Sequence, residues 1–487
     1  MPASSSFTMA ACGLGSHDWP SVSRTARFYL EALTAMGARV LHTADGGWPR
    51  QAIDIGINFS GGDGWERAAG PRDFPLMFAM HGGCVLDAGF LRGALPRLTT
   101  HDALIVNCQS DADILRAMCG QAEPLLEILP LPVDTTLFTP EGRAAARAQL
   151  GLGADTFCVG IVARLLPQKN IHGALELVAE LIARNPGRDV RVVIVGNFWI
   201  DYKILRFDDQ PYSARLRALI ERHGLTQRVS YLPAKLSDQE LAAAYRSFDV
   251  LLHPTNSIDE NFGYAPVEAM ASGVPVVGCA YGGLKETVRD GVTGFLAPTW
   301  LSYGGLREDR GALLRGLEQL LRSATAARAM SAQARRHALA HYGTARAAAT
   351  LQASVRRCLA RRDGAPPRAL ATTAAADMSA YDRFLAPRHD RLSDYAASIL
   401  RYVSHACPRV APGMALRAYA GYADDGVAVT LDNPAWPARY PLSARQRDIL
   451  RRAGTGRAVE QLAGGGAQEL DDMLELGLLV PCAAADR

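Results

Sequence analysis

The sequence is poor in lysine, has no closely spaced pair of cysteines and contains no long apolar run. Only four of its 52 basic residues are lysines, and a net charge of +3 without a basic block argues against a nucleic-acid-binding protein. The nine cysteines occur singly, without the spacing of a zinc site, which indicates a reducing compartment. Because no stretch approaches the ~20 apolar residues of a membrane span and the start lacks the basic region of a signal peptide, we expect a cytoplasmic protein without a transmembrane segment.

Short apolar runs alternate with helical or turn-rich stretches along most of the chain, which predicts α/β domains with parallel sheets. With 487 residues, 48% of them apolar, the chain is long enough for two or three domains. The predicted strands of the first domain are Phe7–Ala11, Arg39–His42, Asp54–Phe59, Leu76–Met80 and Leu104–Asn107. Those of the second are Phe157–Ala163, Val190–Val195, Val229–Leu232, Val250–His253 and Val274–Cys279.

Two doubly wound, Rossmann-like domains in tandem would place a cleft between the carboxyl edges of their sheets. We place the domains at residues 1–143 and 144–345, with a hinge near Thr139–Gly151. A helix and linker at 346–376 and a C-terminal appendage at 377–487 would follow.

The most informative segment runs from Glu260 to Glu268 and places two carboxylates eight positions apart around a glycine. The strand before it ends at Pro254, and Pro266 suits the first turn of a helix ending near Ser272. Glu260 would therefore lie at the carboxyl end of a strand, where open α/β sheets bind their ligands. The backbone amides of Gly263, Tyr264 and Ala265 would point out of the helix start, where a phosphate is favoured.

A second candidate site follows the first strand of the second domain. Arg164 and Lys169 lie five positions apart in a loop at that strand's carboxyl end, an arrangement suited to gripping a pyrophosphate. A lysine retained in a chain so biased toward arginine supports this interpretation.

Taken in order, these motifs resemble the retaining nucleotide-sugar glycosyltransferases of the two-Rossmann type called GT-B, in particular the large family, of the family 4 type, with a Glu-x7-Glu motif. The resemblance covers roughly Ala11 to Arg361 and is densest from Val159 to Pro298. The segments that carry it are Val162–Arg164 with Lys169, Tyr245–Val250, Glu260–Val277, Gly282–Gly283 with Glu286, Asp290–Leu296 and Pro132–Phe138.

The resemblance implies a role for each motif residue. Arg164 and Lys169 would hold the diphosphate of the donor and neutralise the charge that grows on it as the sugar leaves. Glu268 would bind the ribose of the nucleotide and Glu260 the hydroxyls of the transferred sugar. The remaining donor contacts would come from Asn261, the amides of Phe262, Gly263 and Tyr264, His81 in the first domain, and Gly13 and Gly15 in its first loop. The family is generally metal-independent, so we expect no metal and no cofactor besides a UDP- or GDP-linked sugar.

Several of these residues also have a purely structural interpretation. Glu260 and Glu268 could be a solvated loop acid and a helix-start charge, His81 a satisfied buried imidazole, and Gly13 and Gly15 simple turn residues. Glu286 could merely cap its helix, and Gly282–Gly283 could only let the chain turn. Asp111-Ala112-Asp113 has the form of a metal-binding Asp-x-Asp, but at a helix start its acids favour the dipole instead.

The chain also departs from the family. Its first loop, Cys12–Pro20, lacks a clean double glycine, and His81 is followed by glycine where an aspartate is common. The aromatic-rich insertion Asn197–Gln210 follows the strand that usually leads to the nucleotide base, so selection of base or acceptor could differ.

The appendage begins with an amphipathic stretch, Met378–Val403. Ala415–Tyr422 and Val427–Leu431 then bracket a hairpin turn at Asp424–Gly426. Three helical stretches and an apolar run follow, namely Ser443–Arg452, Arg457–Leu462, Gln468–Leu476 and Leu478–Val480. This pattern weakly resembles the winged-helix-like element that recognises peptides in peptide-modifying enzymes. A packing or oligomerisation module is the alternative, while the acids Glu469, Asp471, Asp472 and Glu475 argue against DNA binding.

We therefore predict a retaining glycosyltransferase of the hexosyltransferase type, whose acceptor is a peptide or a small molecule. The protein could form a homo-oligomer. A catalytically silent nucleotide-sugar binder or scaffold that acts through the appendage is the alternative. An epimerase or a phosphorylase of the same fold is disfavoured, the latter because no lysine has a convincing setting for pyridoxal phosphate.

Overall fold

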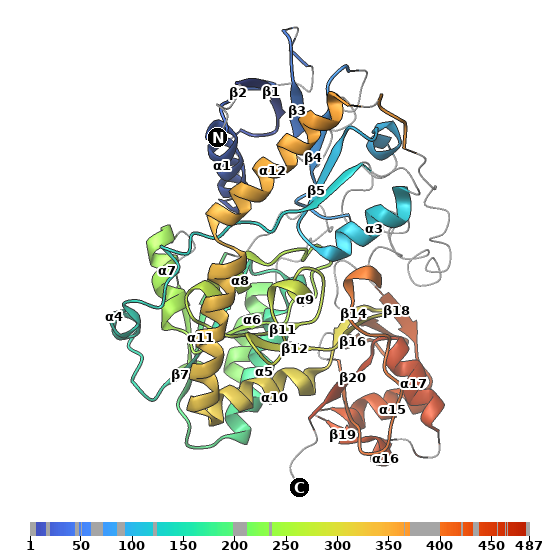
Figure 1. Ribbon diagram of the computed structural model, residues 1–487. Coiled ribbons are helices and arrows are strands. Elements are labelled where there is room, and N and C mark those ends of the chain that lie inside the picture. Colours follow the sequence, from blue (N-terminus) through green and yellow to red (C-terminus); the bar gives the residue numbers. More distant parts are fainter. Residues whose placement is uncertain are drawn as a thin grey trace.

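The computed structural model describes most of the chain in two Rossmann-like halves and a C-terminal module (Figure 1). The residues described are 6–15, 20–43, 48–49, 51–59, 72–84, 93–119, 124–197, 212–232, 236–364, 366–370, 400–419, 422–431, 438–454, 456–462, 464 and 466–483. Within these ranges no helix has the length and apolar character needed to cross a bilayer. The insertion predicted at 197–210, apart from Asn197, and most of Met378–Val403 lie outside the described residues.

The first half is built on a six-stranded parallel sheet in the order β2-β1-β3-β4-β5-β6. Its strands are β1 (Phe7–Cys12), β2 (Ala38–Thr43), β3 (Ile55–Asn58), β4 (Leu76–Ala79), β5 (Ala103–Val106) and β6 (Leu125–Ile128). The connections contain α1 (Pro20–Thr34), η2 (Leu95–Arg97) and α3 (Gln109–Cys119). Strands β3, β4 and β5 are buried throughout, as expected for a parallel sheet covered on both faces.

The second half is a second parallel sheet in the order β12-β11-β10-β7-β8-β9. Its strands are β7 (Phe157–Val162), β8 (Val190–Val195), β9 (Val229–Leu232), β10 (Val250–His253), β11 (Val276–Cys279) and β12 (Gly294–Ala297). Its helices are α4 (Arg143–Gln149), η3 (Pro167–Lys169), α5 (Ile171–Arg184), α6 (Tyr212–Arg222), α7 (Asp238–Ser247), α8 (Tyr264–Ala271), α9 (Leu284–Thr287), α10 (Arg310–Arg322) and α11 (Ala324–His341).

The α/β prediction with two parallel-sheet domains is confirmed, and each strand predicted for these two domains appears with its ends shifted by no more than two residues. Two edge strands, β6 and β12, were missed. Glu127 interrupts the apolar run of β6, and β12 begins with Gly294 directly after a turn at 291–293. Each therefore offers only a short apolar signal, whereas the exposed edge strands β2 and β9 were identified.

After α11 the chain returns to the first half through α12 (Thr344–Arg362), which lies along the first sheet (Figure 1). Ala347, Leu351, Val355 and Cys358 of α12 belong to the same hydrophobic core as α1 and the first strands. The start of the segment predicted as helix and linker is therefore an integral part of the first half.

The C-terminal module comprises residues 400–483 and contains two three-stranded sheets, β19-β15-β20 and β16-β17-β18. Its strands are β15 (Ala415–Ala418), β16 (Tyr422–Asp424), β17 (Ala428–Leu431), β18 (Ala438–Pro441), β19 (Arg457–Ala458) and β20 (Leu479–Cys482). Its helices are α15 (Ala444–Ala453), α16 (Val459–Leu462) and α17 (Ala467–Glu475). The hairpin turn is confirmed between β16 and β17, but the expected long first strand is divided, and β15 pairs with β20 instead.

The module is joined to the second half by the hairpin of β13 (Thr299–Ser302) and β14 (Gly305–Glu308). Trp300 is buried in the hydrophobic core of the module. Arg307 is fully buried, donates to the carbonyl oxygen of Gly477 at 2.8 Å and lies 3.7 Å from the ring centroid of Tyr419. The module is therefore a packed part of the molecule.

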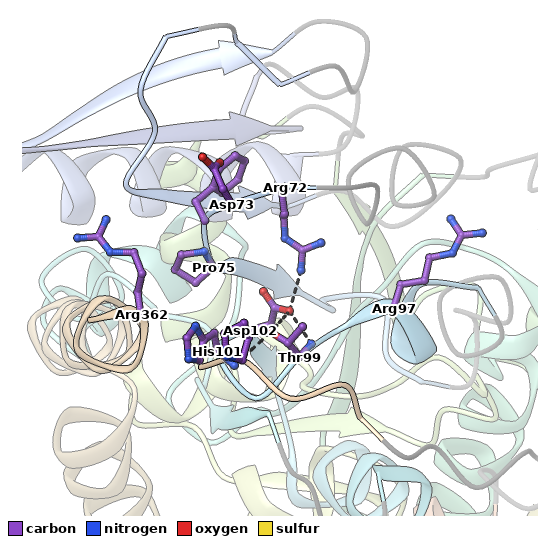
Figure 2. A pocket seen from close by; sticks show the side chains of 10 residues that line it. Arg72, Asp73, Pro75, Arg97, Thr99, His101, Asp102 and Arg362 are labelled. Atoms are coloured by element: carbon purple, nitrogen blue, oxygen red, sulfur yellow. Dashed lines mark hydrogen bonds and ion pairs between the residues drawn. The ribbon is translucent and has the colours of Figure 1, made fainter. Parts of the chain in front are cut away.

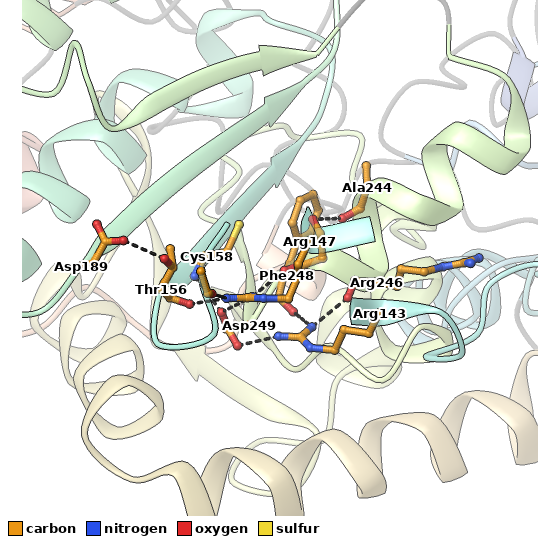
Figure 3. Close-up of polar contacts among 11 residues, drawn as sticks. Arg143, Arg147, Thr156, Cys158, Asp189, Ala244, Arg246, Phe248 and Asp249 are labelled. Carbon is orange, nitrogen blue, oxygen red and sulfur yellow. Dashed lines mark hydrogen bonds and ion pairs between the residues drawn. The ribbon is translucent and has the colours of Figure 1, made fainter. Parts of the chain in front are cut away.

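Helix α4, in the predicted hinge, is tied to the second half by a charged cluster (Figure 3). Asp249 accepts from Arg143 at 2.6 Å, from Arg147 at 3.0 Å and from the amide of Cys158 at 2.7 Å. Arg147 also donates to the carbonyl oxygens of Gly153 and Thr156 at the start of β7. Any hinge between the halves on this segment must therefore precede Arg143.

We expect Asp249→Asn to lower the free energy of unfolding by about 2 kcal/mol, because a half-buried carboxylate that serves two guanidinium groups would be neutralised. Asp189→Asn is the control, since the Asp189 side chain is 43% exposed and its pairs with Arg191 and Arg228 lie at the surface, worth under ~1 kcal/mol. Urea denaturation of the two variants measures the difference. Equal losses would show that α4 is not held by this cluster.

Candidate active site

Most of the predicted donor residues come together where the carboxyl ends of the two sheets meet. Arg164 follows β7, Lys169 ends η3, and Glu260 lies in the loop between β10 and α8. The sequence folds this way because each polar segment follows a largely buried apolar strand and must turn out of the sheet at its carboxyl end.

Lys169 and Glu260 form a buried ion pair. The Lys169 Nζ lies 2.7 Å from the Glu260 Oε2, and each side chain is only 10% exposed. The His253 Nε2 lies 3.3 Å from the same oxygen. Burial alone would raise the pKa of Glu260, but the Lys169 ammonium and His253 outweigh it and hold that pKa well below its ordinary value.

Arg164 faces the neighbouring acid, since its Nη2 lies 3.8 Å from the Asp259 Oδ2. Burial opposes ionisation of Asp259, yet the charges of Lys169 and Arg164 lower the pKa of this carboxyl. Two cations therefore face two ionised acids, and a bound diphosphate would compete with these acids for the cations.

Glu268 lies one turn into α8, as predicted, but both of its oxygens are engaged. Oε1 accepts from Arg24 of α1 at 2.8 Å, and Oε2 accepts from the Tyr245 hydroxyl at 2.9 Å. Burial raises the pKa of Glu268 although Arg24 lowers it. A ribose at this carboxylate would therefore have to displace or share Arg24, and the ribose contact stays a prediction.

The start of α8 supplies backbone donors. Gly263 has a left-handed φ of 82°, and no side chain caps the helix there. Phe262 is buried in the core, so only its backbone could reach a ligand. The Tyr264 hydroxyl lies 2.7 Å from that of Thr25 in α1, which adds a second contact between the halves.

His81, predicted to touch the donor sugar, is satisfied within the first half. Its Nδ1 lies 2.7 Å from the Asn107 Oδ1 and its Nε2 lies 3.1 Å from the Tyr29 hydroxyl. Burial lowers its pKa to about 4, so the ring is neutral at physiological pH. This placement fits the alternative of a structural imidazole.

Asn261 bridges the two halves through its side-chain amide. Its Nδ2 donates to the carbonyl oxygen of His81 at 3.2 Å and lies 3.4 Å from the Asp111 carboxylate. Asp111 is fully buried and also accepts from the amide of Cys84 at 2.7 Å. These contacts favour the structural interpretation of the Asp-x-Asp segment. Among the described residues, no three His, Cys, Asp or Glu side chains gather as a metal site.

The two glycines of the first loop differ. Gly13 has a left-handed φ of 80° at the end of β1, a conformation that favours glycine. A Cβ on Gly15 would meet nothing within 4 Å, so local packing does not demand glycine there. Their predicted contact with the donor stays a prediction.

Glu286 does not cap its own helix but reaches the first half. Its Oε1 accepts from the amide of Gln109, at the start of α3, at 2.6 Å. Burial raises the pKa of Glu286 to about 7 even though this hydrogen bond opposes the rise. The contact lies beside Asn261 and Asp111 and helps to hold the two halves together.

A cavity of about 480 Å³ lies at the other end of the first sheet (Figure 2). Its lining residues Arg72 and Asp102 precede β4 and β5, so it opens at the amino edge of the sheet, away from the motif residues. The Asp102 carboxylate already accepts from Arg72 at 2.7 Å and from the amide of Leu76 at 2.7 Å. The Asp102 carboxylate therefore has a structural role, and we assign no activity to this cavity.

Sequence reasoning gave no role to Arg24, Tyr245 or His253, which touch the motif acids directly. His253 ends a predicted strand at a ligand-binding edge, and this position could have identified it. Arg24 has no such signal, because its partner lies 244 positions further along the chain.

Comparison with known proteins finds a family that matches the second half. Residues 142–337 match the family described as "Glycosyl transferases group 1". D-inositol 3-phosphate glycosyltransferase from Nocardia farcinica is 35% identical over 226 residues, which are 44% of this chain and 47% of that protein. The enzyme of the same name from Mycobacteroides abscessus is 38% identical over 198 residues, 41% of each chain. The chain thus spans about half the length of the curated relatives that it matches.

Solved structures of other proteins share the fold over both halves. Sucrose-phosphate synthase from Thermosynechococcus elongatus superposes with a TM-score of 0.56 at 21% identity, over 73% of this chain and 100% of that one. Anabaena HepE in complex with UDP gives 0.55 at 20% identity, over 72% and 99%. The two Rossmann-like domains therefore have the GT-B arrangement.

The raised pKa of Glu286 predicts that the contribution of this residue to the free energy of unfolding falls as the pH rises from 4.5 to 7. The folded protein keeps the Glu286 proton up to about pH 7, whereas the unfolded chain releases it near 4.5. Because Glu286 is half-buried, we expect a screened loss of about 1–2 kcal/mol across this window. Glu286→Gln, which mimics the neutral acid, should remove this loss.

Thermal unfolding of wild type and Glu286→Gln between pH 4.5 and 8 checks the prediction. Glu240→Gln is the control, because exposed Glu240 has a lowered pKa and should give a constant offset over this range. A wild-type curve parallel to that of Glu286→Gln would contradict it.

Proposed function

We propose that this protein is a glycosyltransferase that moves a sugar from a nucleotide diphosphate sugar to an acceptor. The observation that carries the proposal is the pairing of Arg164 and Lys169 with Asp259 and Glu260 at the carboxyl edge of the second sheet. The match of residues 142–337 to group 1 glycosyl transferases supports it. Because the HepE structure was solved in complex with UDP, a uridine nucleotide is the first donor to test.

In this mechanism the donor diphosphate lies against Arg164, Lys169 and the amides at the start of α8. These groups are fixed before the reaction, so they stabilise the charge that develops on the leaving diphosphate at little reorganisation cost. Glu260, kept ionised by Lys169 and His253, accepts from the hydroxyls of the transferred sugar. Glu268 accepts from the ribose after exchanging one of its present partners.

The alternative is a silent nucleotide-sugar binder that acts through the C-terminal module. A silent binder would bind UDP-glucose without releasing UDP, even over long incubation. Slow release of UDP in the absence of acceptor distinguishes a transferase, because water can replace the acceptor at a competent site.

We further propose that the acceptor is a peptide or small molecule of the cytoplasm and that the C-terminal module, with a winged-helix-like arrangement, presents it. The outer strands β16 and β18 offer edges at which a peptide could add as a further strand. The inositol phosphate in the names of the relatives supplies a small-molecule acceptor to test beside peptides.

Lys169→Met should weaken the binding of UDP by about 10- to 100-fold, because a charge-assisted contact to phosphate is lost. Arg191→Ala removes a cation at the amino end of β8, with a side chain that is 42% exposed, and should leave the affinity unchanged. Isothermal titration with UDP and GDP measures both variants and identifies the base. Equal affinity of Lys169→Met and wild type would refute the phosphate assignment.

The transfer should retain the anomeric configuration and proceed in the presence of EDTA. The cations of Arg164 and Lys169 supply the charge neutralisation that a divalent ion provides elsewhere. Time-resolved NMR of the first glycosidic product reports the configuration, and the rate of UDP release with and without EDTA reports the metal requirement. Loss of activity in EDTA that is restored by Mg²⁺ would overturn the second expectation.

A further inference from the structure

A tyrosine from the C-terminal module is inserted where the two halves meet. Tyr402 has no exposed surface, and its ring lies 5.5 Å from that of Tyr281 in the second half. Its hydroxyl donates to the carboxylate of Asp111 in α3 of the first half. One side chain of the module thus contacts both Rossmann-like halves.

The backbone around Tyr402 is fixed on both sides. Gly282 donates its amide to the carbonyl oxygen of Tyr402 at 2.9 Å. The Lys285 Nζ donates to the carbonyl oxygens of Arg401 at 2.8 Å and Val403 at 3.3 Å. Residues 404 and 405 donate their amides to the carbonyl oxygen of Thr299 in β13. The segment 400–405 is therefore held as a defined strap along the second half.

This strap reaches the loop that carries Glu260. A Cβ on Gly282 would lie 2.0 Å from the carbonyl oxygen of Glu260 and 2.9 Å from the Tyr402 ring, so Gly282 packs between the Glu260 backbone and this ring without space for a side chain. Gly283 donates its amide to the same Glu260 oxygen at 3.0 Å. The Gly282–Gly283 turn thus fixes the Glu260 peptide, and Tyr402 in turn fixes Gly282 through the hydrogen bond to its carbonyl oxygen.

Asp111 provides the second connection. Its carboxylate accepts from Tyr402, from the amide of Cys84 and from the Cys108 thiol, and it lies 3.4 Å from the Asn261 side-chain amide. A fully buried carboxyl group needs such donors to satisfy its oxygens, and removal of one donor changes the positions of the remaining hydrogen-bond partners. Asn261 directly follows Glu260, so movement of Asp111 is transmitted to the predicted sugar contact.

We propose that Tyr402 is a positioning residue for the Glu260–Asn261 segment, acting through Asp111 and Gly282, so that the C-terminal module forms part of the transfer apparatus. The expected effect of Tyr402 on catalysis rests on the proposed function, whereas its effect on the position of the Glu260–Asn261 segment rests on the contacts above. Tyr402 itself touches no reacting group. It sets where Glu260 lies relative to the bound sugar, while Arg164 and Lys169 keep their hold on the diphosphate.

The test compares Tyr402→Phe, which keeps the ring and removes the bond to Asp111, with Tyr231→Phe. Tyr231 is a tyrosine of β9 that is 44% exposed and has the same hydroxyl to lose. With UDP-glucose as substrate, Tyr402→Phe should lower kcat for UDP release by about tenfold because the sugar contact is misplaced. KM should stay within about twofold of wild type, and Tyr231→Phe should match wild type in both constants.

Asp111→Asn completes a double-mutant cycle. If Tyr402 acts through Asp111, the double variant should be no slower than the slower single variant, whereas independent effects would multiply. Multiplying effects, or a KM that rises in step with the fall in kcat, would overturn the positioning role.

Hydrogen exchange provides a readout that does not need activity. In Tyr402→Phe the amides of 257–268 and 108–119 should exchange faster, and those of β7 and β8 should not. If wild type releases no UDP but this local change appears, the proposed function fails and the positioning of the segment stands. Exchange that is unchanged, or faster throughout the chain, would overturn the positioning itself.

Discussion

The arrangement of the motif residues depends on one constraint, which is that every buried charge of the motif must be neutralised by a neighbour. An isolated buried ion costs several kcal/mol, so Lys169 and Glu260 could not both be buried if they were apart. Their separation of 2.7 Å makes the loop after β7 and the loop after β10 a single unit. The same pairing keeps Glu260 ionised. Because a phosphate is also anionic, Lys169 could bind a phosphate in place of the Glu260 carboxylate.

Neutralisation also links the two halves. Arg24 from α1 meets Glu268 of α8, Asn261 reaches Asp111 and His81, and Glu286 accepts from the start of α3. Each of these contacts joins a residue of the second half to a residue of the first. The relative position of the halves is therefore connected to the protonation and pairing of residues that would also meet a donor. Binding of a donor with its diphosphate at Lys169 and its ribose at Glu268 would change those pairs and thereby the contacts between the halves.

The fold and the proximity of the second-half motif residues could be predicted from sequence because their signals are local. A buried parallel strand is a continuous apolar run, and a polar residue that follows it must lie at the carboxyl edge, which is why Arg164, Lys169, Glu260 and Glu268 were identified. The partners supplied by the first half could not be predicted in this way. Nothing around Arg24 marks it as the partner of Glu268, and His81 has the same strand-end position whether its ring faces the cleft or, as found, Asn107 and Tyr29. The edge strands β6 and β12 were missed for a different reason, because Glu127 interrupts the apolar run of β6 and β12 is a short run that begins with Gly294 directly after a turn.

A division of the chain into consecutive domains also understates how the molecule is connected. Helix α12 follows the second half in sequence but completes the core of the first, and Tyr402 belongs to the continuous hydrophobic cluster that contains residues of both sheets. Trp300 of the second half is in turn part of the core of the C-terminal module. Because each part buries side chains of another, removal of the module would expose Trp300 and leave Asp111 without one of its donors. Truncation of the module would therefore disturb the Glu260–Asn261 segment and also remove any ligand-binding site on the module. Only single substitutions such as those at Tyr402 can separate the positioning role of the module from its binding role.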